Sequence, residues 1–134
     1  MEEAKTKKIL IVEDDPAIAQ LYETELTLKG LEVVLAVDGA EGLEKAKTAK
    51  PDLILLDVMM PNVSGIDMLK SLKKDENLKN ITVVMLTNFG QENLIQEAFA
   101  LGIQGYILKY RVTPAELYDK IAVLLGLVKS EWSS

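Results

Sequence analysis

Residues 53–57 read Leu53-Ile54-Leu55-Leu56-Asp57, four apolar side chains in a row and then a carboxylate. Such an uninterrupted run is typical of a strand that is buried on both faces, as the strands of parallel sheets are. Four further short, mainly apolar segments are predicted to be strands, at residues 9–12, 32–37, 82–86 and 105–108. Together with residues 53–56 they predict a five-stranded parallel sheet.

Longer amphipathic segments alternate with these strands and predict five helices. The predicted helices cover residues 17–29, 40–49 after a cap at Asp38, 65–74, 91–101 and 113–127. Gly30 stands where a helix end often needs left-handed backbone, and Thr113-Pro114 offers a cap followed by a helix start. Five repeats of strand and helix predict right-handed crossovers, which place helices on both faces of the sheet.

The composition excludes several kinds of chemistry. The 134 residues contain no cysteine and no histidine, which excludes disulfides, thiolate metal sites, histidine general bases and a histidine phosphoryl donor. The net charge of -6 is opposite to what binding to nucleic acid phosphates requires. No apolar run is long enough to span a bilayer, and residues 1–8 are too polar for a secretory signal. We therefore expect a cytoplasmic protein that binds neither nucleic acid nor membrane.

The length and the hydrophobic content of 49% fit one compact domain. We expect a flexible N-terminus over residues 1–6, one domain over residues 7–127 and a C-terminal tail over residues 128–134. No linker follows the domain, which favours a protein that consists of this domain alone. A piece cut from a longer protein would look the same.

Reactive polar side chains follow four of the five predicted strands. Glu13 and Asp14 follow the first strand, Asp57 the third, Thr87 the fourth and Lys109 the fifth. Ligands of open α/β sheets bind beyond the carboxyl ends of the strands, so these side chains are read together. If the first strand lies beside the third, the three acids converge.

Converging acids need a proton or a cation. Two carboxylates about 4 Å apart repel by about 4 kcal/mol at an effective dielectric constant near 20. Hard oxygen ligands with room for water suit Mg²⁺. Phosphoryl transfer is mostly positioning and charge neutralisation, and an aspartate backed by Mg²⁺, a lysine and a hydroxyl supplies both.

Each of these residues also has an ordinary structural explanation when it is taken alone. Asp15 precedes Pro16 and is predicted to cap the first helix rather than to join the site. Thr87 alone is a common strand-end residue, and Lys109 alone is usually a solvated charge. Tyr106 lies in the fifth predicted strand, where an aromatic ring often serves only packing. The joint placement of the polar residues is what favours a functional site.

The sequence resembles the receiver domain of bacterial two-component signalling over residues 7–127. The matching stretches are residues 9–16, 51–65, 83–87 and 102–109. The resemblance implies a flavodoxin-like, doubly wound sheet of five parallel strands in the order 2-1-3-4-5, with five helices. It also implies a protein that switches when it is phosphorylated and catalyses only its own phosphotransfer and dephosphorylation.

The resemblance implies a role for each matching residue around the phosphoacceptor. Asp57 would accept a phosphoryl group from a sensor histidine kinase or a phosphotransfer protein. Mg²⁺ would be bound by Glu13, Asp14, Asp57 and the backbone carbonyl of Met59, with Asp14 as a direct ligand in preference to Glu13.

The same resemblance implies how the switch would work. Thr87 would contact the phosphoryl oxygen, Lys109 would pair with it, and Tyr106 would be the switch aromatic. Phosphorylation would alter the surface of the fourth helix, fifth strand and fifth helix for an unknown downstream protein target. The wide apolar face of the last helix is explained about equally well by burial and by a partner or dimer surface. We therefore expect a monomer or a weak dimer through that surface.

Four positions depart from the family pattern. Tyr110 follows Lys109 where the family usually has a cis proline, and a cis bond before a non-proline residue costs about 3–4 kcal/mol. We predict a trans bond and a rearranged loop over residues 110–113. Asn88 stands where a small residue is common, which leaves the lifetime of the phosphoryl group open. Gln104 and Gly105 replace an Asp pair, so we do not expect the charged dimer network of transcription-driving relatives.

Three other classes of protein are compared with this sequence by the residues that each class requires. A Mg²⁺-dependent phosphatase with an aspartate nucleophile typically has a second Asp two positions later, where this chain has Met59. A flavin carrier needs a phosphate-binding loop after the first strand, where Glu13 and Asp14 would repel a phosphate. A pseudo-receiver that binds partners without phosphorylation remains the alternative, although the complete set of polar residues argues against it.

Overall fold

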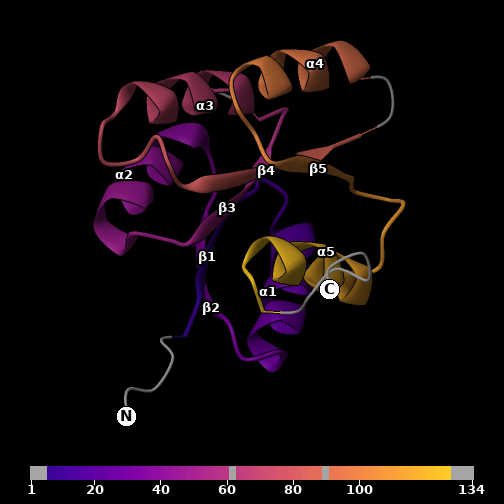
Figure 1. Ribbon diagram of the computed structural model, residues 1–134. Helices are drawn as coiled ribbons and strands as arrows, with labels where there is room; N and C mark the ends of the chain where they lie inside the picture. The colour runs from indigo at the N-terminus through magenta and orange to yellow at the C-terminus, as the bar shows by residue number, and fades with distance from the viewer. Residues whose placement is uncertain (1–5, 61–62, 89–90, 128–134) are drawn as a thin grey trace, which may run out of the picture.

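A computed structural model describes residues 6–60, 63–88 and 91–127 of the chain. It has one five-stranded sheet in the order β2-β1-β3-β4-β5, and every neighbouring pair is parallel (Figure 1). The strands are β1 (Lys8–Val12), β2 (Glu32–Ala36), β3 (Leu53–Asp57), β4 (Thr82–Thr87) and β5 (Gly105–Leu108). The predicted sheet and its strand order are confirmed.

Five helices in the described ranges cover the sheet on both faces. They are α1 (Pro16–Leu28), α2 (Gly39–Ala49), α3 (Gly65–Lys74), α4 (Glu92–Ala100) and α5 (Pro114–Leu124). Figure 1 shows α1 and α5 together on one side of the sheet and α2, α3 and α4 on the other. The fold therefore has three layers, with a separate apolar core on each face of the sheet.

The central strand β3 explains why its sequence is uninterrupted by polar residues. Leu53 and Leu55 belong to the core beneath α1 and α5, whereas Ile54 and Leu56 belong to the core beneath the other three helices. All four side chains are completely buried. Successive side chains of a strand point to opposite faces, so a strand covered on both sides is apolar throughout.

The predicted helix starts are confirmed in detail. Asp15 caps α1, since its Oδ1 accepts hydrogen bonds from the backbone N–H groups of Ala17 at 2.9 Å and Ile18 at 3.4 Å. Thr113 caps α5 as one half of a capping box, in which Glu116 accepts a hydrogen bond from the Thr113 N–H at 2.8 Å. These contacts satisfy N–H groups that a helix start otherwise leaves unpaired.

The ends of α1 and α5 are each followed by a glycine in the left-handed region. Gly30, with a φ of 90°, ends α1 as predicted. Gly126 has a φ of 75° and ends α5 in the same way, because its N–H donates to Val123 O and that of Leu127 donates to Ala122 O. The last helix therefore stops at Leu124, three residues before its predicted end.

The bond between Lys109 and Tyr110 is trans, as predicted, since the described residues contain no cis peptide bond. The loop after β5 is tied down by the N–H of Lys109, which donates to Thr87 O at 2.9 Å, and by the N–H of Arg111, which donates to Leu108 O at 3.1 Å. No helix in the described ranges has the length and apolar character needed to cross a membrane. The expected flexible start and C-terminal tail fall, except for Thr6, outside the described residues.

Candidate functional site

The carboxyl ends of four strands meet at one edge of the sheet, as the parallel register requires. Val12 pairs with Leu56, Asp57 pairs with Leu86, and Thr87 pairs with Leu108. Each polar residue of the predicted site lies at one of these positions or within two residues after it. The chain thus brings residues more than forty positions apart in the sequence to one rim of the sheet.

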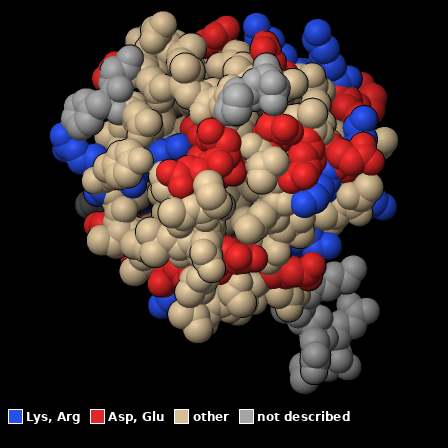
Figure 2. Space-filling model, turned by 180° about the vertical axis from the view of Figure 1, so that it is seen from behind, with Lys and Arg blue, Asp and Glu red and all other residues tan. Residues whose placement is uncertain are grey.

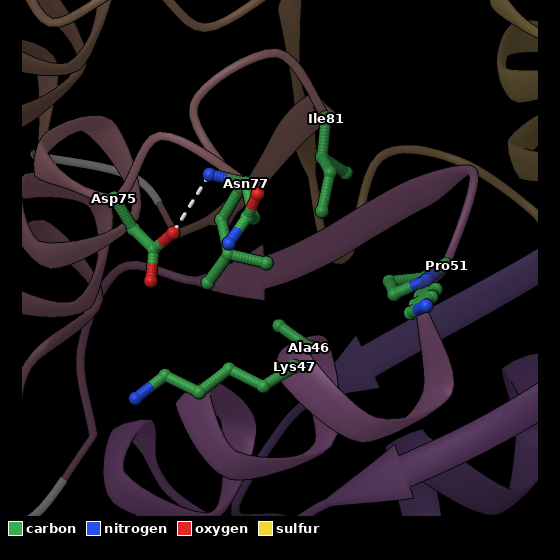
Figure 3. A pocket seen from close by; sticks show the side chains of 8 residues that line it. Ala46, Lys47, Pro51, Asp75, Asn77 and Ile81 are labelled. Carbon is green, nitrogen blue, oxygen red and sulfur yellow. Dashed lines mark hydrogen bonds between the residues drawn. The ribbon is translucent and has the colours of Figure 1, made fainter.

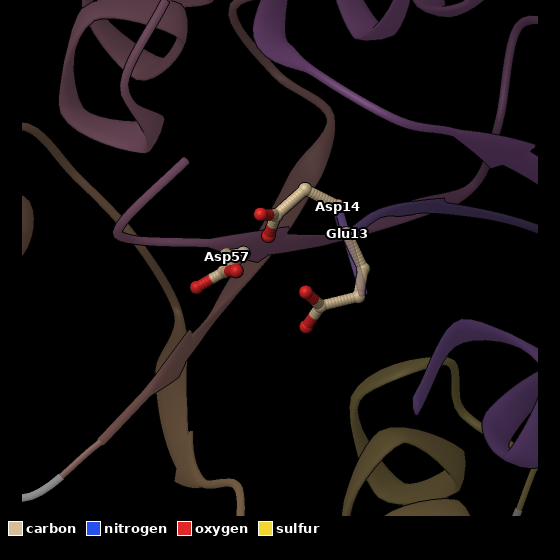
Figure 4. Close-up of side chains that lie close together, drawn as sticks. All are labelled: Glu13, Asp14 and Asp57. Carbon is tan, nitrogen blue, oxygen red and sulfur yellow. The ribbon is translucent and has the colours of Figure 1, made fainter. Parts of the chain in front are cut away.

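Three carboxylates converge at this rim. One oxygen each from Glu13, Asp14 and Asp57 lies within 4.8 Å of the others (Figure 4). Glu13 and Asp57 are buried, whereas Asp14 is exposed, so the cluster is closed toward the protein interior and open to solvent on the side of Asp14. The predicted acid cluster is therefore present as a group of side chains in contact range.

Lys109 supplies the counter-charge from β5. Its Nζ lies 2.9 Å from Asp57 Oδ2 and 2.6 Å from Glu13 Oε1. The Lys109 side chain is only 7% exposed, so these ion pairs are shielded from water and from salt. The sequence indicated that Lys109 faces the acids, but it did not indicate a direct ion pair with Glu13.

Burial shapes the protonation of the site. Loss of hydration raises the pKa of Glu13 to about 7, and its hydrogen bonds with Lys109 and with the Asp15 N–H only partly oppose this. The pKa of Asp57 is also raised by burial, against the opposing effect of Lys109. Burial alone would lower the pKa of Lys109, but the two carboxylates outweigh it and raise that pKa. One ammonium group is shared by two buried acids, so the site favours a further positive charge.

The donor atoms of the cluster fit a hydrated divalent cation. Glu13 Oε1 is buried and, among the described residues, takes no hydrogen bond of good geometry beyond its ion pair. Asp57 Oδ1 accepts a hydrogen bond of 3.2 Å from the Met59 N–H, which holds the backbone of Met59 beside the acid cluster. Carboxylate and carbonyl oxygens around a solvent-open position are the ligands that Mg²⁺ prefers.

Thr87 lies at the rim, but its hydroxyl is engaged elsewhere. The Thr87 side chain is buried, and Oγ1 lies 2.7 Å from Oε1 of Gln91, next to the start of α4. Sequence reasoning treated Gln91 only as the beginning of a helix. No local pattern indicates this contact, since it depends on how α4 packs against the end of β4.

Tyr106 is not a core residue, because 47% of it is exposed on β5. Its ring packs edge to face on Phe99 of α4, with the ring centroids 6.1 Å apart. Both rings line a groove of about 340 Å³ together with Thr87 and Gln91. This placement excludes a role in the core for Tyr106, leaves packing against Phe99 as one explanation, and puts the ring in the same groove as Thr87.

Gly65 is a further residue that shapes the site and that sequence reasoning did not single out. A Cβ at this position would overlap the carbonyl oxygen of Asp57 and lie 2.9 Å from Val58 Cα. The first turn of α3 therefore packs directly on the backbone of the phosphoacceptor candidate. The available signal was a glycine directly after Ser64 in the stretch that leads into the third predicted helix.

A larger hollow of about 840 Å³ lies away from this rim, between the end of α2 and the loop before β4 (Figure 3). Its lining includes Lys47, Pro51, Asp75 and Ile81, and none of the predicted site residues. Pro51 and Ile81 precede β3 and β4, so this hollow lies at the opposite ends of the strands. Size alone does not identify the functional site here.

Comparison with known proteins gives a consistent family. Residues 9–122 match the family model described as "Response regulator receiver domain". The chain is 37% identical over 107 residues to the polar-differentiation response regulator DivK of Brucella ovis, covering 78% of this chain and 85% of DivK. It is also 37% identical over 122 residues to the DNA-binding dual master transcriptional regulator RpaA of Synechocystis, covering 91% of this chain but 49% of RpaA. The chain thus spans about half the length of that relative.

Solved structures show the same similarity in three dimensions. The chemotaxis protein CheY4 of Vibrio cholerae superposes with a TM-score of 0.81 at 32% identity, covering 87% of this chain and 97% of CheY4. A CheY-like receiver domain protein of Methanospirillum hungatei superposes with a TM-score of 0.84 at 30% identity, covering 92% and 96%. Both similarities cover most of this chain.

Proposed function

The chain belongs to the response regulator receiver family of two-component signalling, and we propose that Asp57 is the residue that accepts its phosphoryl group. One observation carries this proposal. Asp57 ends the central strand at a rim where two further carboxylates lie within 4.8 Å and Lys109 Nζ lies 2.9 Å away. This arrangement matches what phosphoryl transfer to a carboxylate requires, namely positioning and neutralised charge.

In the proposed reaction an oxygen of Asp57 attacks the phosphorus of a phosphohistidine or a small acyl phosphate. A bond forms from the Asp57 oxygen to phosphorus, and the bond from phosphorus to the donor breaks, with its electron pair going to the donor. Mg²⁺ would neutralise the phosphoryl oxygens, held by Glu13, Asp14, Asp57 and the carbonyl of Met59. Asp14 is the exposed acid of the group, and in this proposal Asp14 contacts the metal directly in preference to Glu13.

Lys109 changes partner as the reaction proceeds. Before transfer it shares its charge between Asp57 and Glu13. A phosphoryl group carries about -1.5 to -2 charges, and it takes the place of the single negative charge on the Asp57 carboxylate. Lys109 then pairs with the new phosphoryl oxygens, and the Thr87 hydroxyl donates to another of them.

The output of the switch is proposed to be the surface of α4, β5 and α5. Tyr106 lies on that surface, in the groove that Thr87 also lines. Movement of Thr87 toward the phosphoryl group frees space for the Tyr106 ring. A complete change from 1:99 to 99:1 needs about 5.5 kcal/mol, which two or three charge-assisted hydrogen bonds supply.

The proposed partners are a sensor histidine kinase or phosphotransfer protein upstream and a protein target downstream. Residues 7–127 form the proposed functional unit, a cytoplasmic switch that acts on no substrate but its own Asp57. Figure 2 shows several acidic patches on one face of the molecule, which does not favour direct contact with nucleic acid or with an anionic membrane. Val123 and Leu124 are each 41% exposed on α5, and the proposed state is a monomer or a weak dimer through this surface.

The test is incubation of the purified chain with Mg²⁺ and acetyl phosphate, followed by intact mass spectrometry. We expect a single phosphoryl adduct that is absent from Asp57→Asn and retained in Asp119→Asn, which changes an exposed acid on α5. The absence of any adduct from the wild-type chain would contradict the proposal and favour a module that binds partners without phosphorylation.

A further inference from the structure

Gln91 occupies the cap position of α4 but makes no capping hydrogen bond with its side chain. The side chain turns back toward the end of β4 instead. Its Oε1 lies 2.7 Å from Thr87 Oγ1 and 2.9 Å from the backbone N of Asn88. One amide oxygen therefore joins the start of α4 to two consecutive residues at the rim.

The chemistry of the groups determines which atom donates in each contact. A backbone N–H only donates, so the Gln91 atom that faces Asn88 must be the carbonyl oxygen. An amide oxygen only accepts, so the Thr87 hydroxyl donates its single hydrogen to Gln91. That hydrogen is then not available to the Asn88 carbonyl, which lies farther away at 3.1 Å.

Both donors lie at the end of β4, the strand that pairs with β3, and β3 ends in Asp57. Asp57 pairs with Leu86 in the sheet, one residue before Thr87, and the Val58 N–H donates to Leu86 O at 2.9 Å. Lys109, which holds Asp57 by an ion pair, donates its own N–H to Thr87 O at 2.9 Å. A phosphoryl oxygen on Asp57 would be the strongest acceptor within reach of the end of β4, because charge-assisted hydrogen bonds are about twice as strong as neutral ones.

We propose that Gln91 is a positioning residue that holds the Thr87 hydroxyl and the Asn88 N–H in the unphosphorylated chain. It occupies the two donors that a phosphoryl group on Asp57 would need, so they are released only when the phosphoryl oxygen displaces the amide oxygen. Gln91 thereby sets how strongly the resting state resists activation. This inference rests on the proposed function of Asp57.

The contact also couples the rim to the proposed output surface. Gln91 and Thr87 line the same groove as Tyr106 and Phe99. Release of Thr87 breaks the link between β4 and the first residue before α4. The start of α4 and the space beside Tyr106 then become free to change together.

The experiment measures the affinity of beryllium fluoride, a phosphoryl mimic, for the Mg²⁺-loaded chain by isothermal titration calorimetry. Gln91→Leu removes the acceptor at similar volume and is expected to bind the mimic at least about fivefold more tightly, because two ordinary hydrogen bonds are lost from the resting state. Gln91→Glu keeps an acceptor and adds charge, so it is expected to bind the mimic more weakly than wild type.

Two matched variants on the same helix isolate the effect. Asn93 is exposed on α4 and is not part of the lining of the groove, and Asn93→Leu is expected to bind the mimic as wild type does. Asn93→Asp measures how much a new negative charge on α4 weakens binding by itself, and Gln91→Glu is expected to weaken it further. In a Thr87→Ala background the gain from Gln91→Leu is expected to shrink, which a purely structural role of Gln91 would not produce.

Several results would overturn the inference. Equal affinity of wild type and Gln91→Leu, or weaker binding by Gln91→Leu, would show that Gln91 does not oppose activation. An undiminished gain in the Thr87→Ala background would show that the effect does not pass through Thr87. If wild type itself bound no mimic and formed no adduct with acetyl phosphate, the proposed function would fail, which is a different and separately visible outcome.

Discussion

At the scale of single residues, the site depends on one lysine shared between two buried acids. Lys109 lies 2.6 Å from Glu13 and 2.9 Å from Asp57, and all three side chains are at most 7% exposed. Removal of one partner from a buried ion pair leaves an uncompensated charge, which is more costly than removal of the whole group. Lys109 therefore stabilises the resting site and also competes there with any metal ion.

These two effects predict opposite changes in the thermal stability of Lys109→Met, one without Mg²⁺ and one with excess Mg²⁺. Without Mg²⁺ the variant should melt at a lower temperature than wild type, because Glu13 and Asp57 lose their counter-charge. With excess Mg²⁺ it should gain more thermal stability than wild type gains, because no ammonium group competes for the acids. Thermal melts followed by circular dichroism check both changes, with exposed Lys120→Met as the control. A smaller gain from Mg²⁺ in Lys109→Met than in wild type would contradict the proposed metal site.

Gly65 provides a second residue-scale prediction. A Cβ there would overlap the carbonyl oxygen of Asp57, and this neighbour is backbone that cannot turn aside. Gly65→Ala should therefore destabilise the chain by about 1–3 kcal/mol and reduce the yield of the phosphoryl adduct.

Gly105→Ala is the matched control for Gly65→Ala, since a Cβ at Gly105 meets nothing within 4 Å. Urea denaturation measures the stability of both variants. Equal midpoints for Gly65→Ala and wild type would show that α3 is not held against the Asp57 backbone as described.

At the scale of elements, the helices are delimited by local contacts that hold their ends. α5 starts with a complete capping box directly after the loop that replaces the family's usual proline turn. α1 and α5 both end with a glycine in the left-handed region, at Gly30 and Gly126. The loop from β5 to α5 is held at its start by the hydrogen bond from the Lys109 N–H to Thr87 O and at its end by this capping box.

Thr113→Ala removes the hydroxyl that accepts a hydrogen bond from the Glu116 N–H, which is one of the two hydrogen bonds of this capping box. We expect a loss of about 1 kcal/mol in the free energy of unfolding, equivalent to a fall of about 4 °C in Tm for a chain of this size. Thr113→Ser keeps the hydroxyl and should remain close to wild type. Differential scanning calorimetry distinguishes the two variants, and equal melting temperatures would exclude the cap as a source of stability.

At the scale of the whole molecule, one sheet separates two apolar cores. The site lies at the carboxyl ends of the strands, at the edge of both cores. Leu53 and Leu55 face one core, and Ile54 and Leu56 face the other. Asp57 continues this strand by one residue, so its position is set by packing on both faces. A destabilising substitution in either core should therefore lower the stability of the entire domain.

Leu55→Ala tests this arrangement. Leu55 is completely buried, and replacement by alanine should cost about 2–5 kcal/mol in the free energy of unfolding. Leu28, which is 78% exposed at the end of α1, is the matched control, and Leu28→Ala should change stability little. Urea titration followed by circular dichroism measures both. Similar losses from the two substitutions would contradict the described core.

Much of the fold could be predicted from the sequence because its signals are local. Apolar runs, caps at Asp15 and Thr113, and the glycine at Gly30 report on the conformation of their own neighbours, and the structure has elements at those places. The strand order and the roles of the site residues came from resemblance to a family. The convergence of the acids followed from the general rule for ligand sites in parallel sheets.

Only the tertiary structure decided how the side chains at the rim are paired. The ion pair of Lys109 with Glu13, the hydrogen bond from Thr87 to Gln91 and the exposure of Tyr106 have no sequence signal. Periodicity reports which face of an element is buried, but not which rotamer meets a side chain from another strand or helix. Those contacts depend on how complete elements pack together, and a hydrogen bond forms or fails over a few tenths of an ångström.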